Sequence, residues 1–327
     1  MARRKCSLCP ATDRCPARSS VDFARATVID LHHARALARI PPACRRGGPG
    51  WRASAACILE ATAPKPGNVH PGAAFADLSY AELVAAAVAI GPVLEAAATR
   101  PLGLTVRLAV ESSRRVTRSN ANLGLVLAIA PLAAVPGNAS PDPALVERVL
   151  AGLTAADAAE VWAAIRLAAP GGLGTAAVHD VHDPPPADLR AAMRLAAPHD
   201  LVARLWAEGY AALFAGLIRD LDAELAAGES LDDAIVRAYL RQLAREPDSL
   251  IARRHGVAAA ADVSARAAAV IALPEPRWRA AAADLDACLR APRRLNPGTT
   301  ADLVAAALYI QLSIPGRLPL PNLPGDP

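Results

Sequence analysis

The apolar half of this chain consists mainly of small aliphatic residues. Hydrophobic residues make up 53% of its 327 residues and aromatic residues only 3%, so Ala, Leu and Val supply the apolar character. Alanine has the highest helix propensity, whereas β-branched and aromatic residues favour strands. No segment shows the apolar–polar alternation typical of a half-buried strand. We therefore predict an all-α protein with a single multi-helix domain.

Capping residues and helix breakers predict where the helices lie. Ser79 and Glu82 have the spacing of a capping box, which should begin a long helix ending near residue 98. Segment 122–134 is apolar on all sides and should form a buried central helix. Further helices are expected over 51–61, 103–116, 154–169, from 186, over 199–226, from 230, from 262, and from Thr299 or Thr300 to 313.

Basic residues are concentrated at the N-terminus. Residues 1–52 carry a formal charge of +8, and the remainder carries −4. A mildly acidic body argues against nucleic-acid binding. We expect a basic, disordered leader over 1–50, a helical domain over 51–315 and a Pro-rich tail over 316–327. No signal-peptide h-region follows Met1, and the longest uncharged apolar stretch is too short to span a membrane, so we expect a cytoplasmic protein without membrane contact.

Lysine is rare in this chain. Only Lys5 and Lys65 occur among 35 basic residues. Lys65 lies in the segment Ala63-Pro64-Lys65-Pro66-Gly67-Asn68, where the prolines stiffen the loop and Gly67 permits close approach of a ligand. The lysine ammonium is a compact charge suited to phosphate. The segment is therefore a candidate phosphate loop, with a plain surface turn as the alternative.

Asparagine is also sparse, and it occurs in loops and at the expected helix starts. Asn120 and Asn122 precede the apolar helix, and Asn296 begins a Gly-containing segment with the hydroxyls of Thr299 and Thr300. Helix N-termini bind anions, so these side chains are candidates for binding phosphate or ribose. Capping of the helices is the alternative.

Acidic residues supply candidate metal ligands. A Gly-rich loop leads into His179, Asp180, His182 and Asp183, and such clustering indicates a divalent ion, Mg²⁺ rather than Zn²⁺ if a nucleotide is bound. A solvated polar loop is the alternative. Further candidates are the acids Glu60, Asp77 and Asp200, each of which is singly more often a cap or a surface residue.

Taken in order, these segments resemble the triphosphoribosyl-dephospho-CoA synthase family. The resemblance covers about residues 55–313, and its most specific parts together are the PKPG loop at 64–67 and the NPGTTADL segment at 296–303. It also includes Ser119-Asn120-Ala121-Asn122-Leu123-Gly124, His179-Asp180-Val181 and Leu250-Ile251-Ala252-Arg253-Arg254-His255-Gly256. The family is all-α, in agreement with the composition.

The resemblance implies a transferase that uses ATP and 3′-dephospho-CoA. The 2′-hydroxyl of dephospho-CoA attacks C1′ of the ATP ribose, adenine leaves, and the triphosphate stays on the transferred ribose. The product is the prosthetic-group precursor of the acyl carrier protein of citrate or malonate lyase or decarboxylase. Mg²⁺ is expected to accompany the triphosphate.

The chemistry of this transfer gives the candidate residues their roles. Breaking an N-glycosidic bond builds positive charge on the ribose, which nearby carboxylates stabilise. We expect Glu60, Asp77, Asp180 and Asp200 to be catalytic, with the first three also holding Mg²⁺. Lys65 and Arg253 would hold phosphates. The remaining candidates for contact with ATP are Gly67, Asn68, Asn120, Asn122, Thr299 and Thr300.

The chain departs from citrate-lyase-type members of the family. Those members resemble GAHxDM where this chain has residues 72–78, and NTHKG where it has residues 120–124, so two His and one Lys are absent. Two alternatives follow: a transferase with another acceptor, such as a pterin cofactor of one-carbon metabolism, or a non-catalytic nucleotide-binding protein. Convergence of Glu60, Lys65, Asp77, Asn122, Asp180 and Asp302 on one cleft would favour catalysis. The sequence gives no indication of the oligomeric state.

Overall fold

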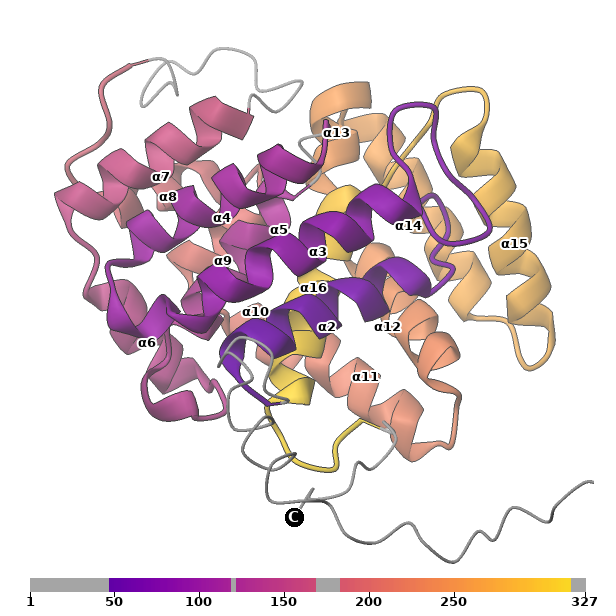
Figure 1. Ribbon diagram of the computed structural model, residues 1–327. Coiled ribbons are helices and arrows are strands. Elements are labelled where there is room, and N and C mark those ends of the chain that lie inside the picture. Colours follow the sequence, from indigo (N-terminus) through magenta and orange to yellow (C-terminus); the bar gives the residue numbers. More distant parts are fainter. Residues whose placement is uncertain (1–46, 119–121, 169–182, 319–327) are drawn as a thin grey trace, which may run out of the picture. The chain divides into compact units, whose positions relative to one another are not determined.

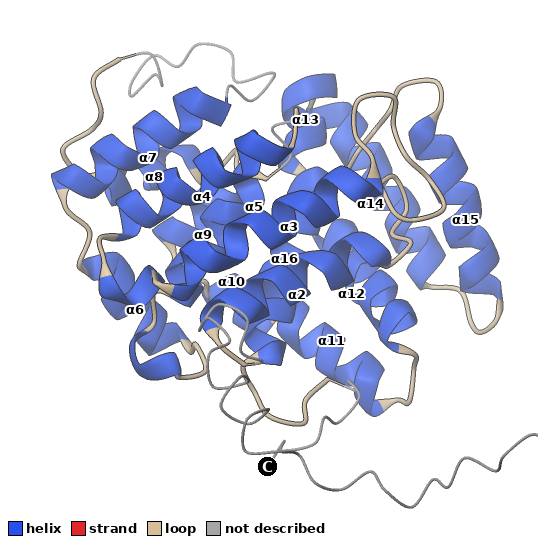
Figure 2. Cartoon of the chain, in the orientation of Figure 1, coloured by secondary structure: helices blue, strands red, loops and turns tan. Residues whose placement is uncertain are grey.

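The computed structural model describes residues 47–118, 122–168 and 183–318, which belong to one compact unit, Pro41–Pro327. These ranges contain no strand, only isolated bridges between His70 and Ala73 and between Phe75 and Leu78 (Figure 2). The all-α prediction is confirmed.

The helices are α2 Pro49–Thr62, α3 Tyr80–Glu95, α4 Leu102–Val116, α5 Leu123–Ala133, α6 Pro143–Ala151, α7 Ala155–Ala168, α8 Leu189–Ala196, α9 Leu201–Ala207, α10 Ala211–Ala215, α11 Leu217–Ala226, α12 Leu231–Arg245, α13 Ser249–His255, α14 Val257–Ile271, α15 Arg277–Arg290 and α16 Gly298–Leu312, with short 3₁₀ turns at Ala97–Thr99 and Pro136–Asn138.

Several helices begin at the caps that the sequence predicts. At the start of α3, the Ser79 backbone N–H donates to the Glu82 carboxylate at 2.9 Å, and the Ser79 hydroxyl accepts from the Glu82 N–H at 3.3 Å. At the start of α12, the Ser230 hydroxyl accepts from the Asp233 N–H at 3.2 Å. These side chains satisfy backbone N–H groups that have no partner within the first turn of a helix.

Other predicted boundaries are wrong. The expected helix over 199–226 is divided into α9, α10 and α11, with Tyr210 at φ 64° between the first two. Asp262 lies inside α14 rather than at its start. The helix expected from residue 186 begins at Leu189 as α8, and the Asp188 carboxylate caps it by accepting from the Ala191 N–H. The expected boundaries of the leader and of the tail remain predictions, although α2 already begins at Pro49.

Two apolar helices occupy the interior. Residues 125–133 of α5 are all buried, which confirms the prediction of a buried central helix. α16 packs against α2, α5, α9, α11, α12 and α13, and it lies behind α2 in Figure 1. Pro131 has no N–H to give to the carbonyl of Leu127, and that carbonyl instead accepts a hydrogen bond from the Trp206 indole at 2.9 Å. A proline within α5 is therefore tolerated because α9 supplies the missing donor.

One described helical segment, Tyr80–Thr99, is long and apolar enough to cross a membrane by length and composition, as core helices of soluble proteins also are. In this fold α3 packs against α2 and α4. The Glu95 carboxylate near its C-terminal end accepts a hydrogen bond from the Gly50 N–H at 2.7 Å. The same carboxylate thus satisfies a free donor at the start of α2.

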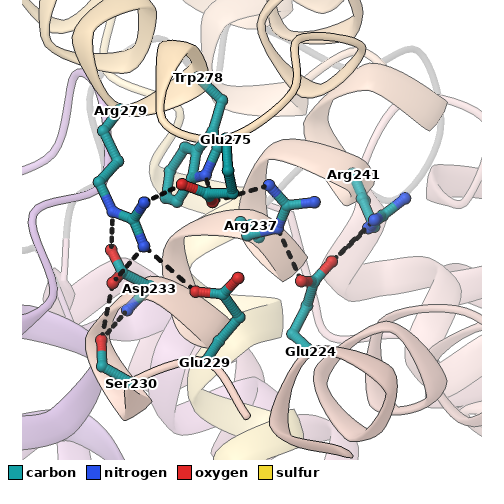
Figure 3. Close-up of polar contacts among 9 residues, drawn as sticks. All are labelled: Glu224, Glu229, Ser230, Asp233, Arg237, Arg241, Glu275, Trp278 and Arg279. Carbon is teal, nitrogen blue, oxygen red and sulfur yellow. Dashed lines mark hydrogen bonds and ion pairs between the residues drawn. The ribbon is translucent and has the colours of Figure 1, made fainter. Parts of the chain in front are cut away.

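A network of charged residues fixes α15 to α11 and α12 (Figure 3). The buried Glu224 carboxylate binds Arg237 at 2.6 Å and Arg241 at 2.7 Å. Arg237 and Arg279 stack on the buried Trp278 ring, with guanidinium carbons 5.1 and 4.8 Å from its centre. Buried, multiply paired charges hold their elements in one arrangement because breaking a pair leaves a desolvated charge. The network therefore fixes the position of α15, whose C-terminal end contributes to the site described next.

Candidate functional site

Charged side chains from four elements meet around the N-terminal end of α16. Glu60 comes from the last turn of α2, Asp200 caps α9, Asp248 caps α13, and Asp302 lies in the second turn of α16. Electrostatic interactions join Asp302 to each of the other three carboxylates. Because α16 packs against α2, α9 and α13, acids far apart in the sequence form one group. We call these four residues the carboxylate cluster.

Lys65 is buried and fully bonded. Its ammonium lies 2.9 Å from Glu60 Oε1, and it donates to the backbone carbonyls of Glu60 and Ala63, with none of its surface exposed. An ammonium has three donors, and three protein oxygens occupy them. Lys65 therefore holds Glu60 in place, and a direct phosphate contact would require one of these bonds to be exchanged. Its predicted role in phosphate binding stays a prediction.

Asp302 is the carboxylate of the cluster that has no hydrogen bond or ion pair within the described ranges. It is half-buried beside Gly124, where a Cβ atom would overlap its Oδ2. Burial raises the pKa of Asp302 well above its usual value, and the nearby charges of Glu60, Asp248 and Asp200 raise it further, while Arg253 lowers it. A raised pKa and a free carboxyl group are properties of proton-transfer residues.

The other two acids of the cluster are already engaged. Asp248 is fully buried and accepts from the backbone N–H and the hydroxyl of Thr300 at 2.7 and 2.8 Å, besides capping α13. Burial raises the pKa of Asp248, and these hydrogen bonds oppose the increase. Asp200 caps α9 and binds Arg253 Nη1 at 3.1 Å. Asp248 thus joins α13 to α16, and Asp200 joins α9 to α13.

The PKPG loop packs on the end of α15 and on the segment that follows it. Gly67 has φ 82°, and a Cβ there would meet Pro297 at 2.8 Å and the Leu295 carbonyl at 2.9 Å. Its N–H donates to Asp286 at 2.7 Å. The Asn68 amide donates to Asn296 Oδ1 at 2.7 Å. Packing of the Leu295 carbonyl and Pro297 against Gly67 therefore explains why residue 67 is a glycine. The predicted contact of Gly67 with ATP has no support beyond the sequence.

Arginines surround the rest of this loop. Arg294 pairs with the exposed Asp77, and Arg290 binds Asp286 at 2.7 Å. Both guanidinium groups lie over the ring of Phe75, at 4.2 and 5.2 Å from its centre. The hydrogen bond from Arg294 lowers the pKa of Asp77. Asp77 therefore lies among cations and outside the carboxylate cluster.

The candidate residues of the sequence fall into three groups. Glu60, Lys65, Asp200 and Arg253 come together at the cluster. Asn122 is buried at the start of α5, two residues before Gly124, and its side chain does not cap the helix. Thr299 is buried in the first turn of α16, as is the structurally engaged Thr300. Asn120 and Asp180 lie outside the described residues, so their roles remain predictions.

Sequence reasoning did not assign roles to several residues that the structure places here. Asp302 was named only as one of six residues whose meeting in one cleft would favour catalysis. No role was predicted for Asp248, Arg254, Arg290 or Arg294. Asp302 and Arg254 lie within the segments that carry the family resemblance. The arginines at 290 and 294 had no signal, because a chain rich in Arg gives no local reason to select them.

The arrangement suits acid–base chemistry on a charged substrate. It combines a free carboxyl group of raised pKa, two carboxylates paired with cations, and neighbouring arginines. Within the described ranges no three His, Cys, Asp or Glu side chains are grouped to hold a metal ion. Mg²⁺ commonly uses one or two carboxylates with phosphate oxygens and water, so this donor set is compatible with an ion brought by a nucleotide.

An all-helical fold with such a site defines a helical enzyme that handles charged substrates. The family model of ATP:dephospho-CoA triphosphoribosyl transferase matches residues 48–317, and the chain belongs to this family. It is therefore a transferase. A crystal structure of an Archaeoglobus fulgidus protein, assigned as a triphosphoribosyl-dephospho-CoA synthase, has the same fold, with a TM-score of 0.55 and 23% identity over 70% of this chain and 98% of that one. No protein of curated function matches the chain.

Proposed function

We propose that this transferase moves the 5-triphosphoribosyl group of ATP onto the 2′-hydroxyl of 3′-dephospho-CoA and releases adenine. Membership of the family supports the overall transfer. The catalytic assignment rests on the carboxyl group of Asp302, which has no partner among the described residues and lies among three other carboxylates that raise its pKa. A carboxyl group with a raised pKa holds a transferred proton more readily than an ordinary Asp does.

In the proposed step, the bond between the acceptor oxygen and C1′ forms while the bond between C1′ and the adenine nitrogen breaks. The bonding electron pair leaves with adenine, the hydroxyl proton passes to the ionised Asp302 carboxylate, and this proton then moves to adenine, which departs as the neutral base. Positive charge develops on the ribose in such a transition state. Glu60 and Asp200, held by Lys65 and Arg253, supply the negative charge that stabilises it.

Mg²⁺ would accompany the triphosphate. Glu60, Asp77 and the undescribed Asp180 are the proposed ligands, and the ion would supply charge neutralisation of the phosphates. Asp77 is the accessible one of the two described acids, since its side chain is 68% exposed.

The test is to incubate the protein with ATP, Mg²⁺ and 3′-dephospho-CoA, and to measure free adenine and the mass of the acceptor. Equal amounts of adenine and of an acceptor enlarged by triphosphoribose are expected. The Asp302→Asn variant should release far less adenine, whereas Arg266→Gln, an exposed pair on α14, should match the wild type. Hydrolysis of ATP to adenine with no enlarged acceptor would contradict the proposed acceptor.

A second candidate keeps the donor and changes the acceptor. It is favoured by the departures at residues 72–78 and 120–124, where citrate-lyase-type members have two His and one Lys that this chain does not. The same assay distinguishes it when pterin alcohols replace dephospho-CoA. Transfer to a pterin alone would assign the chain to another cofactor pathway. Absence of adenine release with every acceptor would favour a nucleotide-binding protein without catalysis.

A further inference from the structure

Four arginines lie together beside the carboxylate cluster. They are Arg253 and Arg254 on α13, Arg290 at the end of α15, and Arg294 in the segment before α16. Arg254 interacts electrostatically with Arg253, Arg294 and Asp77, and Arg290 shares the Phe75 ring with Arg294. We call these four residues the arginine rim.

The rim has more hydrogen-bond donors than its protein partners use. Arg253, Arg290 and Arg294 each bind one carboxylate, yet Arg253 Nε, Arg290 Nη1 and Arg294 Nε are buried without an acceptor within the described ranges. Buried polar groups are nearly always hydrogen-bonded, so three such donors in one place indicate a missing acceptor.

Arg254 has no acceptor at all among the described residues. The residue as a whole is exposed, but partial desolvation of its guanidinium and the charges of Arg294 and Arg253 lower the pKa of that group. Like charges at this separation repel, so the fold bears a cost that an anion would remove. Guanidinium groups match the geometry of phosphate oxygens better than a lysine ammonium does.

We propose that the arginine rim, centred on Arg254, is the subsite for the polyphosphate chain of a substrate. It rests on the proposed function in that the ribose of this substrate would lie at the carboxylate cluster. The polyphosphate is either the triphosphate of ATP or the diphosphate of the acceptor, which share the same chemistry. Lys65, whose three donors are occupied, is not required for this contact.

The test uses inorganic tripolyphosphate, titrated calorimetrically into metal-free protein at low salt. Arg254→Gln should weaken binding by about 10-fold or more, since hydrogen bonds to charged groups are among the stronger ones. The control Arg266→Gln removes an equal charge from exposed α14 and should bind as the wild type does. Equal affinity of Arg254→Gln and wild type, or equal losses in both variants, would overturn the proposal.

A second variant should act in the opposite direction. Asp77→Asn removes the carboxylate that pairs with Arg294 and lies near Arg254, so tripolyphosphate binding should become tighter. A rim with only a structural role would not gain affinity. Unchanged or weaker binding in this variant would count against the subsite.

Steady-state kinetics show which substrate supplies the polyphosphate. If it belongs to ATP, Arg254→Gln raises KM for ATP and leaves KM for dephospho-CoA unchanged, and the reverse holds for the acceptor. The titration needs no turnover, so a protein that binds tripolyphosphate through Arg254 but releases no adenine would retain the subsite and refute the transferase. Adenine release with unchanged KM values in Arg254→Gln would support the transferase and refute the subsite.

Discussion

At the scale of single residues, the site depends on how the protein distributes charge between two neighbouring acids. Glu60 forms an ion pair with Lys65, whereas Asp302 has no ion pair with any residue that the structure describes and lies among three carboxylates. Carboxylates in different environments can take different protonation states at the same pH, which is how enzymes separate acid from base roles. Two residue-scale predictions follow from this difference.

Replacement of Asp302 by Asn should stabilise the protein and impair catalysis. The raised pKa means that the native state binds this proton more tightly than the unfolded state, so stability falls as pH rises from about 4, the value for an unfolded Asp, through the native pKa. The variant should therefore be more stable than the wild type at pH 7 and release adenine more slowly by about 100-fold or more. Urea denaturation at several pH values measures the first effect. A variant less stable than the wild type at pH 7 and equal at pH 4 would contradict it.

Replacement of Lys65 by Met should destabilise the protein by about 3–5 kcal/mol, because it leaves Glu60 as an unpaired buried charge. Combining Lys65→Met with Glu60→Gln should recover most of this stability, since neither remaining group is charged. Neither protein should transfer triphosphoribose. Thermal unfolding and the adenine assay together check this cycle. Full activity in the single variant Lys65→Met would show that Lys65 and Glu60 are not part of the functional site.

At the scale of elements, the contact between α5 and α16 fixes the position of Asp302, the proposed proton-transfer residue. Asp302 of α16 approaches α5 at Gly124, where any larger residue would overlap the carboxylate. The arrangement of α13 relative to α16 is fixed separately through Asp248 and Thr300. The site is therefore built from helix ends that touch, and small residues at the contacts set its dimensions.

Gly124→Ala tests this contact. In the wild type, the added methyl group should displace Asp302 and destabilise the protein by about 1–3 kcal/mol, as overpacking does. In an Asp302→Ala background the overlap disappears, and the substitution should be neutral or slightly stabilising because Ala is a better helix former than Gly. Denaturation of the four proteins of this cycle gives the coupling. Equal costs in both backgrounds would show that Gly124 does not position Asp302.

At the scale of the whole molecule, ion pairs with arginine make stability depend on pH. A hydrogen bond from Arg279 lowers the pKa of Asp233, one from Arg190 lowers that of Glu147, and one from Arg294 lowers that of Asp77. Carboxyl groups with a lowered native pKa stabilise the fold above their unfolded values, and this contribution is lost as pH falls through the native pKa. The loss of stability that these groups cause as pH falls below about 4 is thus opposite in direction to the loss that Asp302 causes as pH rises above about 4.

Asp233→Asn should isolate this contribution within the network of Figure 3. We expect the variant to be less stable than the wild type at pH 7, and this difference to shrink toward pH 2 as the Asp233 carboxylate takes up its proton. Asp262→Asn, which removes an exposed pair on α14, serves as the control and should change stability little at either pH. Urea denaturation midpoints at pH 7 and pH 2 measure these stabilities. A loss of stability in Asp233→Asn that is equal at both pH values would contradict the prediction.

Local sequence patterns predicted much of the helical structure and less of its interruptions. The capping box at Ser79, the helix start at Ser230 and the apolar run of α5 were correct because each depends on neighbours within one or two turns. The division of 199–226 was missed. There Tyr210 takes a left-handed conformation while its hydroxyl donates to the Ala128 carbonyl of α5 at 2.8 Å, a contact with a distant helix.

The sequence by itself determined the all-helical class and the family, and it selected Glu60, Lys65, Asp200 and Arg253 as candidates, which the fold brings together. Composition and helix caps act locally, and the family segments can be recognised in order along the chain. Only the tertiary structure decided what these residues do. Packing of α16 against α2, α5 and α13 left Asp302 without a hydrogen bond or ion pair to any described residue, placed protein oxygens at the three donors of Lys65, and brought the arginine rim together. A group's charge state and availability depend on every neighbour in space, and those neighbours come from distant parts of the chain.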